Sequence, residues 1–296
     1  MSGRGIDFLE NWVNKNVTSA DRKGIQDRAT GLAAQCHQKA AAVGEAIMAI
    51  RFASGIWRAT TFNYQMNFPV ILTVVTAMVA LTAIAERFDL GTGGTVTTIF
   101  WIVVAMSVHA TILKNQPGFA IHKDGKEFVP FMWRAFVLVG LGLVGLIPFL
   151  VIVMPLLNNL NRELWIIPFL AIYGIVETFI LSLWGTCLPA VIVHSDASFA
   201  TAWQRGKKTF GYVFVRLLFL AGLGYTITFA GLALFITIAL SDMTYWTKDG
   251  GLYFSNILAQ LIFTLAFAYQ IVMVATVLSR AFLIAESPDT NQGPSR

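Results

Sequence analysis

Charged residues are scarce in this 296-residue chain: Asp, Glu, Lys and Arg make up 12% of it, whereas hydrophobic residues make up 56%. A soluble domain has about 25% charged residues and roughly 45–50% apolar ones. With so few charges the folded chain could not keep its surface in water, so lipid must cover much of that surface. The composition therefore predicts an integral membrane protein.

Cysteines and catalytic groupings are also lacking. The two cysteines, Cys36 and Cys187, fall in regions of different predicted depth, which excludes a disulfide framework, and neither has the spacing of a metal or redox motif. The chain shows no Ser-His-Asp grouping, no paired carboxylates and no H-E-x-x-H motif. We therefore expect no enzyme, no metal and no cofactor. Nucleic acid is not an expected partner, because no compact basic region remains outside the hydrophobic runs.

Long hydrophobic runs fill most of the chain after residue 67. A helix that crosses a bilayer core needs about 20 apolar residues. Six runs meet this requirement, at about 68–85, 95–113, 131–157, 164–193, 212–240 and 255–284. The predicted fold is thus an all-α integral membrane domain of six transmembrane helices over 67–285. Since the first run begins near Phe68, we expect an uncleaved anchor and no cleavable signal peptide.

Lys and Arg collect in alternate loops, and this bias predicts the orientation. Loops 114–130 and 194–211 hold six of these residues, whereas the loops between them hold one each, namely Arg87, Arg162 and Lys248. Eight more precede the first run. Both termini and the two basic loops are therefore expected on the cytoplasmic side.

Residues 1–66 differ in kind, because charges interrupt their apolar positions. Arg51 and Arg58 lie on one helical face, and apolar residues lie on another: Val43, Ile47, Ile50 and Trp57. This pattern predicts a basic amphipathic helix on the cytoplasmic leaflet, although an ordinary helix packed under the bundle fits it as well. Residues 286–296 are predicted to be a disordered cytoplasmic tail.

A spaced pattern of Phe, Arg and Gly-Leu-Gly occurs twice, 82 positions apart: Phe128, Arg134 and 140–142, then Phe210, Arg216 and 222–224. In each copy the arginine lies just inside an apolar run that follows a basic loop. The pattern predicts that the six helices form three repeated hairpins. Residues 140–145 also match G-x-G-x-x-G, but glycines inside a membrane helix cannot meet a phosphate. We interpret them as surfaces of close helix contact.

The basic loops provide candidate contacts with lipid headgroups. Arg134 and Arg216 lie at a depth where an arginine either snorkels to the headgroups or pairs with a lipid phosphate or a carboxylate. Residues 198–210 interleave aromatic and basic residues, which is typical of an interfacial helix on anionic lipid; a generic basic loop is the alternative. The candidate residues are Arg134, Trp203, Arg205, Lys207, Lys208 and Arg216.

Glu177 lies near the middle of the fourth run, where a lone carboxylate is costly. Its predicted partners at the same level are Tyr269 and Gln270. One interpretation is a proton or cation site, and the other is a protonated glutamate that makes one interhelical hydrogen bond. His109 is interpreted as a helix-packing or interfacial histidine. Its predicted depth differs from that of Glu177 by about two helical turns (roughly 5.4 Å each), which argues against a shared catalytic site.

The segment from Ala197 to Gly224, in which an aromatic and arginine-bearing stretch leads into a Gly-Leu-rich run, resembles a group of bacterial six-span membrane proteins. This group is related to the membrane domain of glycerophosphodiester phosphodiesterase-like proteins, and Phe119–Gly142 is a fainter copy of the segment. The resemblance extends over about 65–285 and implies a six-span fold in the bacterial inner membrane. No phosphodiesterase domain accompanies it here, so hydrolase activity is not implied. The N-terminal ~45 residues are similar to small uncharacterised proteins of rhizobia-type bacteria, which implies a source and no function.

Three functions are consistent with these features. We expect a non-enzymatic multi-pass module that interacts with anionic lipid or supports a partner, either another protein or a second copy of the chain. The first alternative is a transporter or channel with Glu177 in its pathway. The second is an intramembrane enzyme that acts on lipid.

Overall fold

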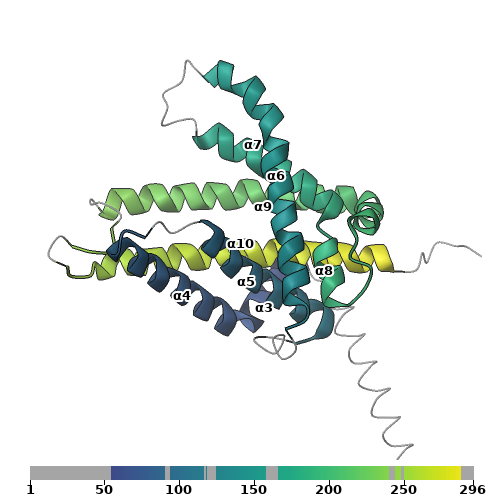
Figure 1. Cartoon of the computed structure of the whole chain (residues 1–296), viewed down its shortest axis with the longest axis horizontal. Coiled ribbons are helices and arrows are strands. Elements are labelled where there is room, and N and C mark those ends of the chain that lie inside the picture. Colours follow the sequence, from purple (N-terminus) through teal and green to yellow (C-terminus); the bar gives the residue numbers. More distant parts are fainter. Residues whose placement is uncertain are drawn as a thin grey trace, which may run out of the picture. The chain divides into compact units, whose positions relative to one another are not determined.

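The computed structural model describes residues 55–90, 94–116, 118, 125–157, 166–239, 244–247 and 250–287. Their regular structure is helical, apart from one isolated β-bridge between Trp246 and Leu252 (Figure 1). The all-α prediction is therefore confirmed for these residues. Most of the predicted amphipathic N-terminal region and of the predicted tail lies outside them.

The helices follow one another in the order α3 (Ile56–Met66), α4 (Phe68–Arg87), α5 (Gly94–Lys114), α6 (Phe128–Leu157), α7 (Ile166–Trp184), α8 (Cys187–Ile192), α9 (Phe199–Ala239) and α10 (Phe254–Glu286). Four helical stretches are long and apolar enough to cross a membrane: Phe68–Arg87, Thr97–Lys114, Phe128–Phe149 and Phe254–Glu286. They coincide with four of the six predicted spans. The stretch Ala171–Trp184 of α7 is apolar but shorter.

The predicted run 164–193 forms two helices instead of one. α7 ends at Trp184, and α8 begins at Cys187. Pro189 has no N–H, and its ring would clash with the carbonyl four residues earlier in a continuous helix. That carbonyl belongs to Gly185, which instead accepts a hydrogen bond from the Leu188 N–H at 3.1 Å. The proline thus explains why the helix is interrupted one turn before it.

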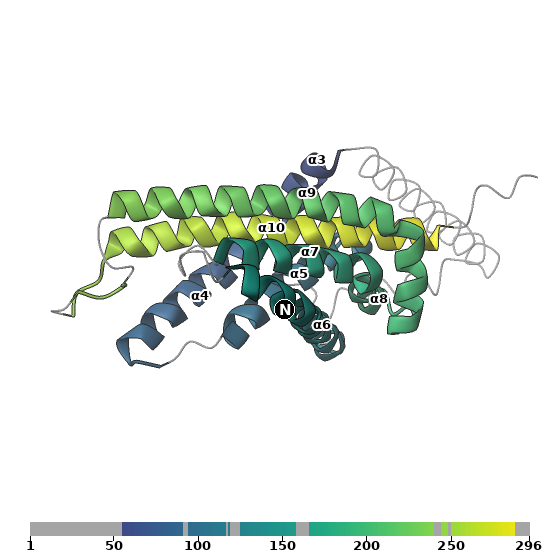
Figure 2. The ribbon, with the colours of Figure 1, turned by 90° about the horizontal axis from the view of Figure 1, so that it is seen from above.

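α9 is one helix of 41 residues that includes both the predicted interfacial segment and the predicted fifth span. Its start is fixed by Ser198, whose hydroxyl oxygen accepts a hydrogen bond from the Thr201 N–H at 3.3 Å, as N-cap residues do. The first turns of α9 run at a steep angle to the rest of the helix, which lies alongside α10 (Figure 2).

α10 is the central helix of this part of the chain. It contacts α3, α4, α5, α8 and α9, and every residue from Ala275 to Phe282 is buried. α3 packs against α10 and α5, so the compact unit begins at Gly55. The predicted boundary between the N-terminal region and the membrane domain, at residue 66, therefore falls after a helix that belongs to the bundle.

Basic loops that the charge pattern assigned to one side meet at one end of α10. Glu127, just before α6, pairs with Lys114 at the end of α5 and lies 2.8 Å from His194 Nε2, which follows α8. Arg205 near the start of α9 pairs with Glu286 at the end of α10. We call this end the Glu286 end.

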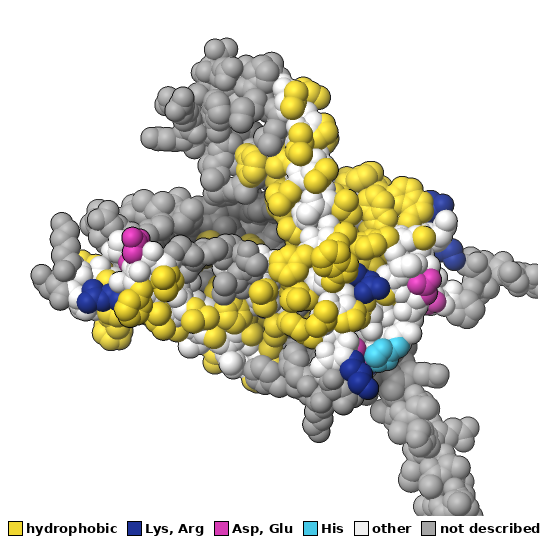
Figure 3. Space-filling model, in the orientation of Figure 1, with side chains coloured by type: hydrophobic (Ala, Val, Ile, Leu, Met, Phe, Trp, Pro, Cys, Tyr) yellow, Lys and Arg dark blue, Asp and Glu magenta, His cyan; other side chains and the backbone are white. Residues whose placement is uncertain are grey.

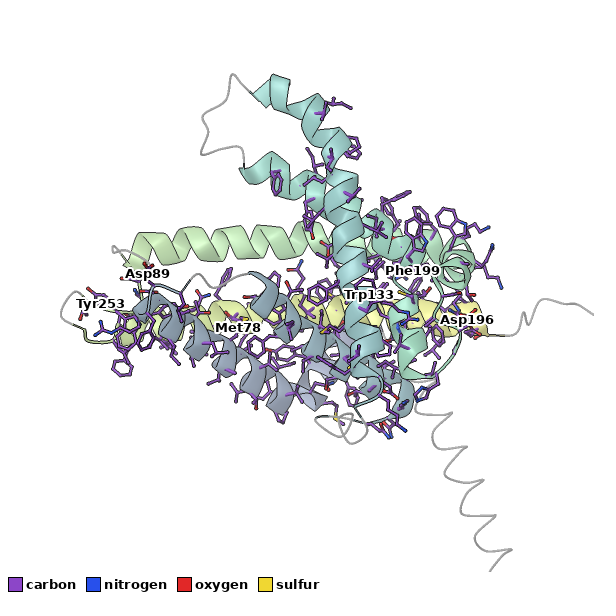
Figure 4. The ribbon with its side chains drawn as sticks, in the orientation of Figure 1. Met78, Asp89, Trp133, Asp196, Phe199 and Tyr253 are labelled. Carbon is purple, nitrogen blue, oxygen red and sulfur yellow. The ribbon has the colours of Figure 1, made fainter. Side chains whose placement is uncertain are left out.

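Two of the loops assigned to the other side, the one after α4 and the one before α10, meet at the opposite end. The Tyr245 N–H donates a hydrogen bond to the Glu86 carboxylate at 2.8 Å, and Trp246 Nε1 donates to the Ala83 carbonyl at 2.7 Å. Burial, and then the Glu86 charge, raise the pKa of Tyr245. Asp89 and Tyr253 lie at this end, far from Asp196 and Phe199 at the other (Figure 4).

Hydrophobic side chains face outward between the two ends. Val151 is 69% exposed, Phe219 64% and Val144 62%. On the face drawn in Figure 3, charged side chains lie toward the ends and hydrophobic ones occupy the area between. Soluble monomers rarely expose so much contiguous apolar surface, so this surface is compatible with a membrane protein.

Glycines bring some of these helices close together. A Cβ on Gly145 would lie 2.9 Å from Val176 Cγ1, and one on Gly224 would lie 2.8 Å from Gln270 Cδ. A Cβ on Gly140 would meet no described atom within 4 Å. The interpretation as helix-contact glycines therefore fits Gly145 and Gly224 but not Gly140. The tightest approach is at Gly206, where a Cβ would lie 2.1 Å from the Leu183 carbonyl oxygen.

Gly206→Ala should displace the first turns of α9 from α7, because the new methyl group would collide with backbone and not with a flexible side chain. We expect a loss of about 2–3 kcal/mol of stability, the upper part of the range for overpacking, measured by thermal unfolding in detergent. Gly140→Ala is the matched control and should leave the midpoint unchanged or raise it. Equal midpoints for the two variants would contradict the close contact.

Candidate functional site

Arg205 is a buried arginine whose three guanidinium nitrogens are all used. Its Nε donates to the Glu286 carboxylate, Nη1 to the Asp196 carbonyl at 2.7 Å, and Nη2 to the Ser195 hydroxyl at 3.0 Å. The guanidinium also lies over the Phe282 ring, 5.1 Å from its centroid, and the side chain is 7% exposed. Arg205 therefore ties the start of α9 to the end of α10. The prediction that it contacts a lipid headgroup does not fit this geometry.

Asp196 stabilises the turn before α9. Its carboxylate accepts hydrogen bonds from the Thr201 hydroxyl and from the Ser198 N–H. These bonds, the Thr201 bond first, hold the pKa of Asp196 below its usual value, because they favour the charged form. The start of α9 is thus defined by local hydrogen bonds as well as by Arg205.

Arg134 and Arg216, the two arginines of the repeated pattern, share one local geometry. Nη1 of each donates to the carbonyl four residues earlier, that of Pro130 at 3.0 Å and that of Tyr212 at 3.2 Å. Each side chain therefore bends back toward the start of its helix, as snorkelling requires. Arg134 Nε also donates to the Ala197 carbonyl at 2.8 Å, which leaves it less available to a lipid. The guanidinium carbon of Arg216 lies 3.8 Å from the centroid of the Tyr212 ring, on the same helix.

Lys207 and Lys208 are exposed and lie on the side of α9 away from its buried residues, which are Ala202, Arg205, Gly206 and Thr209. Trp203 packs on Trp184 with ring centroids 5.1 Å apart. The two tryptophans line a shallow apolar hollow together with Phe199, Ala200 and Gln204. We call residues 199–208 with this hollow the α9 platform.

The predicted grouping of Glu177, Tyr269 and Gln270 is not formed among the contacts that the structure describes. The Glu177 carboxyl is hydrogen-bonded to Tyr173, one turn earlier on α7. The Tyr269 hydroxyl lies 3.1 Å from Thr61 Oγ1 of α3, whereas Gln270 packs on Gly224 of α9. Neighbouring residues of a helix point about 100° apart at 3.6 residues per turn, so Tyr269 and Gln270 face different helices.

A buried polar cluster lies where α3, α5 and α10 meet, and the sequence did not indicate it. Asn63 Nδ2 donates to Thr276 Oγ1 at 3.2 Å, and His109 Nδ1 lies 2.7 Å from Ser279 Oγ. With Thr60 these residues form what we call the polar junction, and each of the five is at most 4% exposed. The sequence feature that could have indicated the junction is a pair of polar residues three positions apart on one helical face. It occurs twice, as Thr60 with Asn63 and as Thr276 with Ser279. This spacing was missed because α3 had been placed outside the bundle.

His109 is predicted to be a helix-packing or interfacial histidine, and its burial fits the packing role in part. Its ring lies 5.7 Å from the Phe131 ring, and Nδ1 is paired with Ser279. Its other nitrogen, however, has no hydrogen-bond partner among the described atoms. No group of three or more His, Cys, Asp or Glu within the described part of the chain could hold a metal ion.

Comparison of the chain with protein-family models, with curated proteins and with solved structures gives no match. The features of the chain that bear on its function are therefore the α9 platform, the arginines and the polar junction.

Arg205→Met should destabilise the protein, because it leaves the Glu286 carboxylate and two loop acceptors without their donor. We expect a loss of about 2–3 kcal/mol, less than for a fully buried ion pair since Glu286 is partly exposed. Arg216→Met serves as the control, and its loss should stay below about 1 kcal/mol because its hydrogen bond is within one helix. Thermal unfolding of both variants checks this, and equal losses would show that Arg205 has no special role.

Proposed function

We propose that this chain is a non-enzymatic multi-pass membrane protein that binds anionic lipid through the α9 platform. The observation that carries the proposal is the exposure of Lys207 and Lys208 on a helix whose other face is fixed to the protein. Six spans, both termini on the cytoplasmic side and a bacterial inner membrane complete the proposal.

The rigidity of the platform supports this function. Gly206 lies against the α7 backbone at Leu183, and Arg205 is bonded to Glu286 of α10. The two lysines are therefore presented from a fixed helix, so less conformational entropy is lost when a headgroup binds. The apolar hollow beside them gives the acyl region of a lipid a surface to contact.

The arrangement of the helix ends supports the proposed orientation. The platform lies at the Glu286 end, where the basic loops meet. Basic residues near an anionic cytoplasmic leaflet each contribute about 1 kcal/mol of attraction. An end that carries these loops therefore favours the leaflet with anionic lipid.

The two alternatives have less support. A transport pathway through Glu177 would require polar partners around it, but Tyr269 and Gln270 are directed to α3 and α9. A lipid-acting enzyme that uses Glu177 and His109 would require one shared cavity. Glu177 is instead bonded within α7, and His109 is bonded to Ser279 of α10.

The double variant Lys207→Glu/Lys208→Glu should reduce the binding of anionic lipid, because two attractive charges become repulsive. Native mass spectrometry of the full chain, equilibrated with a mixture of phosphatidylglycerol and phosphatidylethanolamine, measures the retained lipid. If each lysine contributes about 1 kcal/mol, retained phosphatidylglycerol should fall by roughly tenfold to thirtyfold.

The matched control is Arg58→Glu/Lys126→Glu, which makes the same change of charge at two exposed cations outside the platform. It should reduce retention far less. Unchanged retention in the lysine variant, or an equal reduction in both variants, would argue against the α9 platform as the lipid site.

A further inference from the structure

The polar junction contains three buried atoms that lack a hydrogen-bond partner among the described residues. They are Thr60 Oγ1, Asn63 Oδ1 and His109 Nε2. Buried polar atoms in proteins are nearly always paired, either with other protein groups or with a bound molecule. These three are the only such side-chain atoms found in the described part of the chain, and all belong to one cluster.

The orientation of Asn63 is fixed by its neighbours. The Thr276 hydroxyl donates its hydrogen to the Val272 carbonyl at 2.7 Å, so its oxygen can only accept from Asn63. Asn63 must therefore point its Nδ2 at Thr276, which leaves Oδ1 as an acceptor that needs a donor. An exchange of the amide oxygen and nitrogen cannot remove this requirement.

Two of the residues with unpartnered atoms, Asn63 and His109, meet α10 at neighbouring turns. Asn63 reaches Thr276, and His109 reaches Ser279. Positions three apart on a helix lie on the same side, as do Thr60 and Asn63 on α3. Two helices, α3 and α5, thus bring residues with unsatisfied polar atoms to one stretch of α10.

A chain of polar groups connects the junction to the loop after α5. Asn67 Nδ2 donates to the Asn63 carbonyl at 2.8 Å, and its Oδ1 accepts from the Ser107 and Thr111 hydroxyls at 2.7 and 2.9 Å. Those hydroxyls also lie 3.4 Å from the carbonyls of Gly118 and Gln116 in the loop. Polar groups therefore extend from the loop into the bundle.

We propose that the polar junction is a binding site for a small neutral solute that donates and accepts hydrogen bonds, of which water is the smallest. A donor is required by Asn63 Oδ1, and the hydroxyl and imidazole groups can take either role. The atoms that lack a partner are a hydroxyl oxygen, an amide oxygen and an imidazole nitrogen, which suit a neutral solute. This proposal is independent of lipid binding by the α9 platform.

Apolar replacements distinguish an occupied junction from an empty one. Thr60→Val removes one unpartnered hydroxyl from the full-length protein. In an empty junction it removes an unpaired buried atom and should raise the unfolding midpoint. In an occupied junction it removes a hydrogen bond to the solute, and we expect the midpoint to fall by roughly 2–4 °C.

Thr209→Val is the matched control, since the Thr209 hydroxyl is equally buried and donates to the Arg205 carbonyl of its own helix at 3.1 Å. The proposal requires Thr60→Val to lower the midpoint more than Thr209→Val does. A rise in the midpoint for Thr60→Val, or a fall no larger than that of the control, would overturn it.

A second measurement uses the unmodified protein and so does not depend on how the variants fold. Radiolytic hydroxyl-radical footprinting in lipid nanodiscs oxidises buried side chains that lie beside bound water. His109 should be oxidised faster than Cys187, although Cys187 is intrinsically more reactive and equally buried, because Cys187 belongs to the apolar core. Protection of His109 to the same degree as Cys187 would overturn the proposal.

Discussion

Polar side chains on the C-terminal half of α10 impose the strongest constraint on this bundle. Thr276, Ser279 and Arg280 interrupt an apolar helix and are all buried. In lipid, apolar contact gives little preference for one helix neighbour over another, so close packing and interhelical hydrogen bonds decide which helices associate. Asn63 of α3 bonds to Thr276 and His109 of α5 bonds to Ser279, and α8 and α9 also contact α10. Their need for partners thus explains why α10 is central.

A second constraint acts where α9 begins. The contact of Gly206 with Leu183 and the ion pair between Arg205 and Glu286 fix the first turns of α9 against α7 and α10. Because Arg205 and Gly206 occupy the buried face of α9, Lys207 and Lys208 lie on its exposed face. The exposure of the lysines is therefore a consequence of packing, and the proposed lipid contact follows from how the helix is held.

Features that depend on composition and charge could be predicted from the sequence. Side-chain contacts between segments far apart in the sequence could not. Runs of apolar residues located four helices that could cross a membrane, and the charge bias grouped the loops that meet at each end. Pro189 indicated a boundary, yet the start of α8 depends on how Gly185 is bonded. The neighbours of Glu177 could not be predicted from depth alone, because depth does not say which way Tyr269 and Gln270 face. The contact of Arg205 could not be predicted either, because its partner Glu286 is 81 residues away.

The α9 platform and the polar junction depend on the same end of α10. Ser279 precedes Glu286 by seven residues, which is two helical turns or roughly 10 Å along the helix axis. Glu286 holds the platform through Arg205, and Ser279 holds His109 of the junction. A rigid helix transmits displacement along its axis, so a shift of α10 that loosened one site would also alter the distances in the other. The protein thus carries its proposed surface contact and its buried polar site on one helical segment that is enclosed by its neighbours.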